Sequence, residues 1–261
     1  VVEGVDASLP LRLLDGNGNP LPLLLANGAA RLAIFGQEVH VEVGASQEGV
    51  VYEVIDNAQR LLDPKEQKPL SAAVTGTSDP IVLTLSSRVG EDLDLTVRAS
   101  LKRKRGQALS EQQKVLDAVL PLRVRANPAV PLRLEAPVMA PNAPAVVVIG
   151  DPAGAGESGS QSSVRYQLWA RPLADEDWRF ESPAAAAEIT VIGESLAGFS
   201  DQKVGAAGNG AVLNLEQSVS GEGMVVAALA RKEHSRDAFH LGTNETHPSE
   251  LPLRQAVVVF T

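Results

Sequence analysis

The sequence predicts an all-β protein built from two tandem antiparallel immunoglobulin-like β-sandwich domains. Three observations support this fold class: a recurring tetrad, short segments that alternate polar and apolar residues, and frequent Pro and Gly. The 261 residues include 17 Pro and 22 Gly, which indicates many short elements. Hydrophobic residues make up 44% of the chain but aromatic residues only 3%, so we expect aliphatic cores.

The internal repeat is the first of these observations. The tetrad Leu-Pro-Leu-Arg begins at Leu9, Leu120 and Leu251, and an Asn-Pro pair follows the first two copies. Further segments then match in the same order: 22–25 with 131–134, 39–43 with 146–149, 51–54 with 165–168, 74–78 with 191–195, 81–85 with 211–215, and 93–99 with 224–230. A repeat of this length decides the architecture, because each copy is one folding unit.

Each copy holds about seven short segments, and several alternate polar with apolar residues, as 93–99 does. This period of two is typical of half-buried antiparallel strands, and about seven of them fit an immunoglobulin-like sandwich. We expect the tetrad on the closing strand of a copy, at an edge where Pro is tolerated.

The predicted boundaries follow from the same repeat. Residues 1–15 are the closing strand of a preceding repeat or an extra strand of the first domain. Residues 16–126 form the first sandwich, and 127–261 form the second, with enlarged loops. The junction contains Pro, which fixes φ, so we expect a stiff connection. Residues 110–118 fit either two helical turns or one arm of a hairpin.

The second copy is longer, and its extra residues indicate a binding region. About thirteen of them fall in 196–210, which we expect to be a Gly- and Ala-rich loop, and 151–163 is also loop-like. Both would gather at one pole with 232–250, as antibody binding loops do. Neutral insertion is the alternative origin, because loops accept insertions at little cost. The candidate ligand-binding residues are Trp178, Asp201, Lys203 and Asn209.

Charge and composition exclude several partners. The net charge of −9 disfavours a nucleic acid or an anionic membrane, since both require clustered cations. No apolar run is long enough for membrane insertion. The basic run 102–105 is expected in a solvated hairpin loop, with a docking patch for an acidic partner as the alternative. The absence of Cys excludes disulfides and zinc–thiolate sites.

No motif indicates catalysis or a cofactor. The segment 191–198 has the Gly-x-Ser start of an esterase nucleophile elbow, but its fifth position is Ala197 and no helical pattern follows. Serine hydrolase is therefore a remote alternative. The His and carboxylate residues between 233 and 247 match no zinc spacing. The turn 15–20 has no Glu where a calcium loop requires one. We expect no catalytic residue, no metal site and no cofactor.

The segment Asp15-Gly16-Asn17-Gly18-Asn19-Pro20-Leu21-Pro22 resembles the Asp-x-x-Gly-Asn-Pro segment of bacterial immunoglobulin-like repeats in surface adhesins and intimin-type proteins. The tandem arrangement is also similar to fibronectin III-like accessory domains of large bacterial toxins and to phage or injection-system fibres. The resemblance implies a non-enzymatic spacer and recognition module, extracellular or on a bacterial surface. It would bind a protein or glycan receptor and adjoin neighbouring repeats of the same polypeptide. A receptor-binding segment of a toxin or fibre is the alternative.

Overall fold

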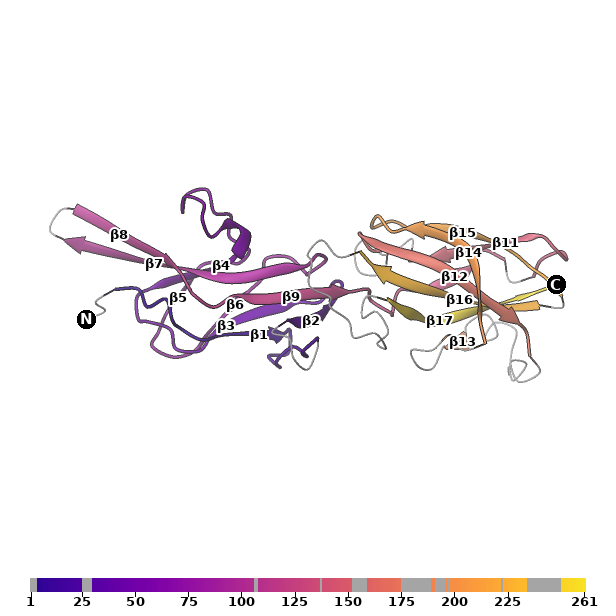
Figure 1. Cartoon of the computed structure of the whole chain (residues 1–261), viewed down its shortest axis with the longest axis horizontal. Helices are drawn as coiled ribbons and strands as arrows, with labels where there is room; N and C mark the ends of the chain where they lie inside the picture. The colour runs from indigo at the N-terminus through magenta and orange to yellow at the C-terminus, as the bar shows by residue number, and fades with distance from the viewer. Residues whose placement is uncertain are drawn as a thin grey trace. The chain divides into compact units, whose positions relative to one another are not determined.

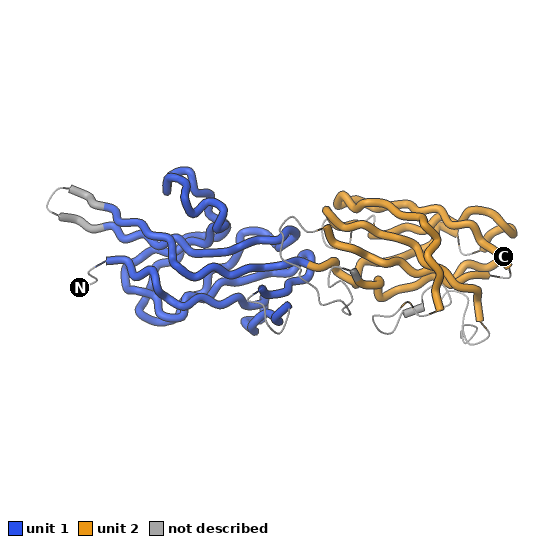
Figure 2. Tube along the Cα trace, viewed as in Figure 1, with its two compact units in different colours: residues 1–124 blue, residues 125–261 orange. Residues whose placement is uncertain are grey.

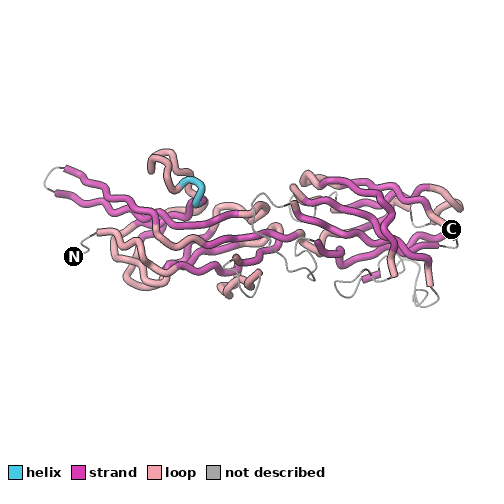
Figure 3. The backbone as a smooth tube through the Cα atoms, viewed as in Figure 1, coloured by secondary structure: helices cyan, strands magenta, loops and turns pink. Residues whose placement is uncertain are grey.

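The computed structural model describes residues 4–24, 30–105, 108–136, 138–151, 159–174, 189–190, 196, 198–221, 223–233 and 250–261. The chain forms two compact units, Val1–Val124 and Arg125–Thr261 (Figure 2). Strands dominate both units, and the described residues contain one 3₁₀ turn, η1 (Asn57–Gln59) (Figure 3). No helix among the described residues is long and apolar enough to cross a membrane.

Unit 1 is a sandwich of two sheets (Figure 1). Its strands are β1 (Leu11–Asp15), β2 (Arg31–Ile34), β3 (Val39–Val43), β4 (Val51–Asp56), β5 (Val74–Thr75), β6 (Ile81–Thr84), β7 (Leu93–Arg105), β8 (Ala108–Val115) and β9 (Leu120–Arg125). The smaller sheet has the order β1-β3-β6, and the larger has the order β2-β9-β7-β4-β5, with β8 paired to β7. The pairs β1–β3, β3–β6 and β4–β7 are antiparallel.

Unit 2 repeats this plan. Its strands are β10 (Leu132–Leu134), β11 (Pro144–Ile149), β12 (Val164–Pro172), β13 (Ile189–Thr190), β14 (Ser200–Ala207), β15 (Leu213–Ser218), β16 (Gly223–Lys232) and β17 (Glu250–Phe260). The sheets have the orders β10-β11-β15 and β13-β17-β16-β12-β14. The order β9-β7-β4-β5 therefore corresponds to β17-β16-β12-β14, and β1-β3-β6 to β10-β11-β15.

Aliphatic alternation explains why these segments form strands and why the sheets pack. In β3 the side chains of Val39, Val41 and Val43 are buried while the residues between them are partly exposed. They join Leu95 and Val97 of the other sheet in one core cluster. Each fully buried Val or Leu contributes roughly 1.5–3 kcal/mol, so the core can rely on aliphatic residues. The predicted fold class, two antiparallel immunoglobulin-like sandwiches, is confirmed.

The register of the repeat differs from the prediction at its first tetrad. Pro10 precedes β1, and its carbonyl oxygen accepts a hydrogen bond from the Gly44 amide at 2.9 Å. Pro131 precedes β10, and its carbonyl oxygen accepts from the Gly150 amide at the same distance. The first tetrad thus corresponds to Val130-Pro131-Leu132-Arg133 and opens the smaller sheet of unit 1, whereas the other two tetrads lie on β9 and β17. The predicted match of 22–25 with 131–134 is wrong, because local similarity alone did not show which strand each segment pairs with.

The expected loop at 196–210 is also wrong, because most of it is the edge strand β14, paired to β12. Gly205 permits the close approach of the two backbones, since a Cβ there would lie 3.0 Å from the Tyr166 carbonyl oxygen. A register shift near Lys203, whose φ is +56°, bends the strand. The sequence of β14 shows little alternation of polar and apolar residues, because most of its residues are small or polar.

Two segments of unit 1 form a hairpin. Of the two structures expected for 110–118, helical turns or a hairpin arm, the structure has the hairpin arm, because β8 pairs antiparallel to β7 from Ala108 to Val115. The basic run 102–105 forms the last residues of β7 and not a loop, since each of its residues has a partner in β8. The matched segment 191–195 lies outside the described residues.

Candidate functional site

A buried tyrosine in each unit holds the loop that precedes it. The Tyr52 hydroxyl accepts a hydrogen bond from the Gln47 amide at 2.8 Å, and the Tyr166 hydroxyl accepts from the Gln161 amide at 2.9 Å. Burial raises the pKa of Tyr166 to about 12, which outweighs the opposite effect of the hydrogen bond from Gln161. Each tyrosine therefore stays neutral and fixes the glutamine that lies five residues before it.

Both glutamines in turn hold the segment that enters their unit. The Gln47 side-chain oxygen accepts from the Asp6 amide at 2.7 Å. The Gln161 side-chain oxygen accepts from the Asn127 amide at 2.9 Å. We call this arrangement the glutamine clamp. Ser-Gln-x-x-Val-x-Tyr occurs at 46–52 and at 160–166, so a search for identical residues at fixed spacing could have found it.

A glycine completes each clamp. The Gly76 amide donates to the Val50 carbonyl at 2.7 Å, and the Gly208 amide donates to the Val164 carbonyl at 2.6 Å. A Cβ on Gly76 would collide with the backbone oxygen of Gln47, and one on Gly208 with that of Gln161. The end of β5 therefore corresponds to the end of β14.

Of the predicted binding residues of unit 2, the structure brings Asp201 and Lys203 together and places Asn209 beyond the other end of β14. Trp178 lies outside the described residues. The Asp201 carboxylate accepts from the Gln167 side chain at 2.6 Å and from the Lys203 amide at 2.7 Å, near the start of β14. Asn209 lies beyond the other end, where its side-chain oxygen accepts from the Ala211 amide at 3.0 Å. Asp201 and Ala207 lie opposite Trp169 and Arg165 of β12, which are four residues apart, so Asp201 and Asn209 are separated by roughly 20 Å, more than one small ligand spans.

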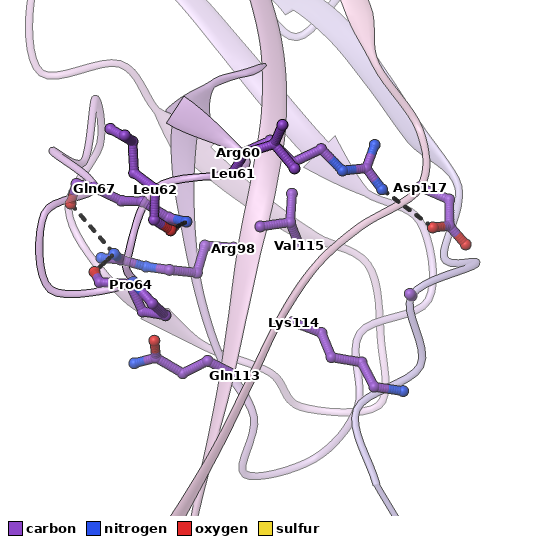
Figure 4. A pocket seen from close by; sticks show the side chains of 11 residues that line it. Arg60, Leu61, Leu62, Pro64, Gln67, Arg98, Gln113, Lys114, Val115 and Asp117 are labelled. Atoms are coloured by element: carbon purple, nitrogen blue, oxygen red, sulfur yellow. Dashed lines mark hydrogen bonds and ion pairs between the residues drawn. The ribbon is translucent and has the colours of Figure 1, made fainter. Parts of the chain in front are cut away.

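Unit 1 contains a groove that the sequence reading missed. It has a volume of about 410 Å³ and lies between the loop after η1 and strand β8 (Figure 4). Residues 60–67 supply one wall and residues 113–117 the other, with Arg98 of β7 between them. This volume falls within the range of about 300–1,000 Å³ that is typical of ligand sites. Two adjacent leucines in the polar segment 56–68 were the available sequence signal.

Arg98 fixes the loop wall of the groove. Its Nη2 and Nε donate to one Glu53 oxygen at 2.6 and 3.2 Å. Its Nη1 donates to the carbonyl oxygens of Pro64 and Gln67 at 2.7 and 3.2 Å. Nε and Nη2 thus bind Glu53 of the neighbouring strand β4, and Nη1 connects the sheet to the loop, so the loop wall of the groove is preformed.

Two hydrogen-bond acceptors beside the groove lack donors. The side-chain oxygens of Gln67 and Gln113 are buried and have no hydrogen-bond partner. The Gln67 Nε2 donates to the Leu62 carbonyl at 3.0 Å, and the Gln113 Nε2 donates to Glu111 at 3.0 Å. Because the amide nitrogens are engaged, each side chain offers an acceptor, and a buried acceptor without a donor is costly.

The rim of the groove is apolar and cationic. Leu61 is 96% exposed and Leu62 is 45% exposed, which is unusual for leucine. Arg60 forms an ion pair with Asp117 at 3.4 Å, and both side chains reach solvent. An exposed pair of this kind contributes about 0–1 kcal/mol, so a ligand can displace it. The groove therefore suits a ligand with hydrogen-bond donors, apolar groups and negative charge.

The described residues contain no group of three or more potential ligands that could hold a metal ion. The Asp15 carboxylate accepts from the Asn19 and Asn17 amides at 2.8 and 2.9 Å, so it closes a turn. These hydrogen bonds, chiefly that from Asn19, lower the pKa of Asp15. The elbow-like serine and the His residues between 234 and 247 lie outside the described residues.

No protein-family model and no curated protein matches this chain. Among solved structures, an ICAM-5 D1–D4 ectodomain fragment is 14% identical with a TM-score of 0.35, over 96% of this chain and 53% of that one. A variant of Salmonella alpha-2-macroglobulin is 13% identical with a TM-score of 0.26, over 99% and 15%. The methylamine-reacted Salmonella protein is 12% identical with the same TM-score and coverage. The chain spans about half or less of these proteins, and such TM-scores support no inference about function.

Proposed function

We propose that this chain is a non-enzymatic spacer and recognition segment of a larger bacterial surface or secreted protein. The observation that carries the proposal is the short connection between two anchored residues at the junction. The Val124 amide donates to Asp92 in unit 1 at 2.9 Å, and the Asn127 amide donates to Gln161 in unit 2 at 2.9 Å. Two residues separate these anchors, and one of them, Ala126, is fully buried in the core of unit 2.

A junction of this length leaves little conformational freedom. The carbonyl oxygen of Pro128 accepts from the Arg254 amide at 2.8 Å, which ties the start of unit 2 to its closing strand β17. Proline also fixes φ at this position. A connection without a flexible linker is what a spacer requires, because each free residue would add conformational entropy.

The glutamine clamp supports the tandem arrangement. Asp6 occupies in unit 1 the place that Asn127 occupies in unit 2, and each side chain accepts a hydrogen bond from the amide two residues later. The incoming segment of unit 1 therefore adopts the conformation of a segment that joins two sandwiches. This likeness supports neighbouring repeats of the same polypeptide as partners.

The experiment measures the distance distribution across the junction by pulsed electron paramagnetic resonance. Because the chain has no Cys, labels can be attached at Val82→Cys on β6 and Glu216→Cys on β15, both at exposed positions. We expect a narrow distribution that broadens in Gln161→Ala and stays narrow in the control Gln167→Ala. A broad distribution in the unaltered background would refute the spacer role.

A further inference from the structure

We propose that the groove of unit 1 binds an extended acidic segment of a partner protein. The inference deepens the recognition half of the proposed function and rests on it. It places recognition in unit 1, in a preformed groove, and not in the predicted loops of unit 2. Three properties of the described residues carry it: local charge, unpartnered acceptors and an exposed apolar rim.

The charge around the groove is opposite to that of the chain. The charged residues that line the groove are the cationic Arg60, Arg98 and Lys114 and the carboxylate Asp117, whereas the whole chain has a net charge of −9. Arg98 and Lys102 are four positions apart on β7, so their backbone positions lie on one face of the strand. Lys114 lines the groove from β8. This concentration of positive charge favours a partner with several carboxylates.

The unpartnered acceptors favour a polypeptide. The side-chain oxygens of Gln67 and Gln113 come from opposite walls of the groove. Figure 4 shows both side chains beside Arg98, on the same side of the strand that carries Gln113. The backbone of an extended peptide supplies amide donors at regular intervals, and these can satisfy both acceptors when the two glutamine side chains turn toward the peptide. A hydrogen bond to each glutamine oxygen recovers the free energy that is lost when an acceptor is buried without a donor.

The apolar rim distinguishes a polypeptide from a sulfated glycan or a membrane surface. Leu61 is 96% exposed beside Leu62, and apolar side chains of a peptide can cover both. A sulfated glycan offers charge and hydroxyl donors but no comparable apolar side chain. A planar headgroup layer cannot reach acceptors that lie below the rim of a groove.

The test is fluorescence anisotropy with the full chain and a fluorescein-labelled peptide of alternating Glu and Val. We expect the chain to bind this peptide in preference to one of alternating Lys and Val, with an affinity that falls as salt rises. Leu61→Glu should weaken binding by about tenfold or more. The matched control Val82→Glu replaces another exposed apolar residue, on β6 of the smaller sheet, and should not change binding.

A second variant separates binding from stability. Gln113→Met removes the unpartnered acceptor and keeps the length of the side chain. We expect weaker peptide binding with unchanged or raised thermal stability, whereas a structural role for Gln113 would lower stability and leave binding intact.

The proposal would be overturned by no binding of the acidic peptide, by equal binding of both peptides, or by equal affinities of Leu61→Glu and Val82→Glu. Binding to dextran sulfate or to vesicles containing phosphatidylserine that Leu61→Glu leaves unchanged would overturn it in favour of those partners. The junction distances are measured separately, so a failure of the groove and a failure of the spacer role can be distinguished.

Discussion

Replacing Arg98 by Met should destabilise unit 1 far more than removing an exposed arginine. The Arg98 side chain is 10% exposed and its partner Glu53 is 21% exposed, so the ion pair is largely shielded from water. Met retains much of the aliphatic stem but removes the donors to Glu53, Pro64 and Gln67. The Glu53 carboxylate is then buried without its cation.

The magnitude follows from that unpaired charge. Removing one partner of a buried ion pair typically costs about 3–5 kcal/mol, and we expect a loss of free energy of unfolding in this range. The double variant Arg98→Met with Glu53→Leu removes the stranded charge and should recover part of the loss. It should not recover all of it, because the carbonyl groups of Pro64 and Gln67 still lack their donor.

The assay must report on unit 1 alone. Both Trp residues belong to unit 2, so their fluorescence follows that unit. A cysteine at Ala99, a fully buried position on β7, reports unit 1, because the chain has no other thiol to label. The urea concentration at which this thiol becomes reactive should fall by about 1–5 M in Arg98→Met, given typical urea m-values of about 1–3 kcal/mol/M.

The control is Arg12→Met, in the same unit. The Arg12 side chain is 74% exposed and lies 3.8 Å from Glu42, so its removal should cost less than about 1 kcal/mol. If Arg98→Met and Arg12→Met shift the thiol-protection midpoint equally, the argument that Arg98 anchors the groove wall is refuted.

The remaining predictions concern unit 2 and the clamps. Burial raises the folded-state pKa of Tyr166 to about 12 from 10.0. The contribution of its neutral hydroxyl to the free energy of unfolding is therefore fully present below pH 10 and should be lost as pH rises toward 12. The loss is at most about 3 kcal/mol and can be followed by Trp fluorescence in urea. Tyr166→Phe should remove this pH dependence. At neutral pH this variant should cost about 1–3 kcal/mol, because it leaves the Gln161 amide without an acceptor. Gly208→Ala should destabilise unit 2, and Gly76→Ala unit 1, in the same two assays; normal stability would contradict the collision with the clamp backbone. Deleting 200–207 should lower the stability of unit 2, because it removes β14 and exposes the edge of β12; an unchanged urea midpoint would instead support the original loop prediction.

The local pattern of the sequence was enough for the fold class and most of the strands. Alternation in 39–43 and 93–99 depends only on neighbouring residues, and β3 and β7 lie at these places. The match of 51–54 with 165–168 is also local, and it places the buried Tyr52 and Tyr166 on corresponding strands.

The register of the repeat and the groove depended on contacts between distant residues. The first tetrad has the same residues as the other two, yet its strand pairs with β3 in the smaller sheet, while β9 and β17 lie in the larger sheets. The partners of Arg98 lie between 31 and 45 residues away in the chain. The sequence by itself determined where the chain is extended and what fills its cores, because those properties follow from local alternation. Only the tertiary structure decided which strands pair and which polar groups meet beside the groove, because hydrogen bonding and burial act between segments that are brought together by folding.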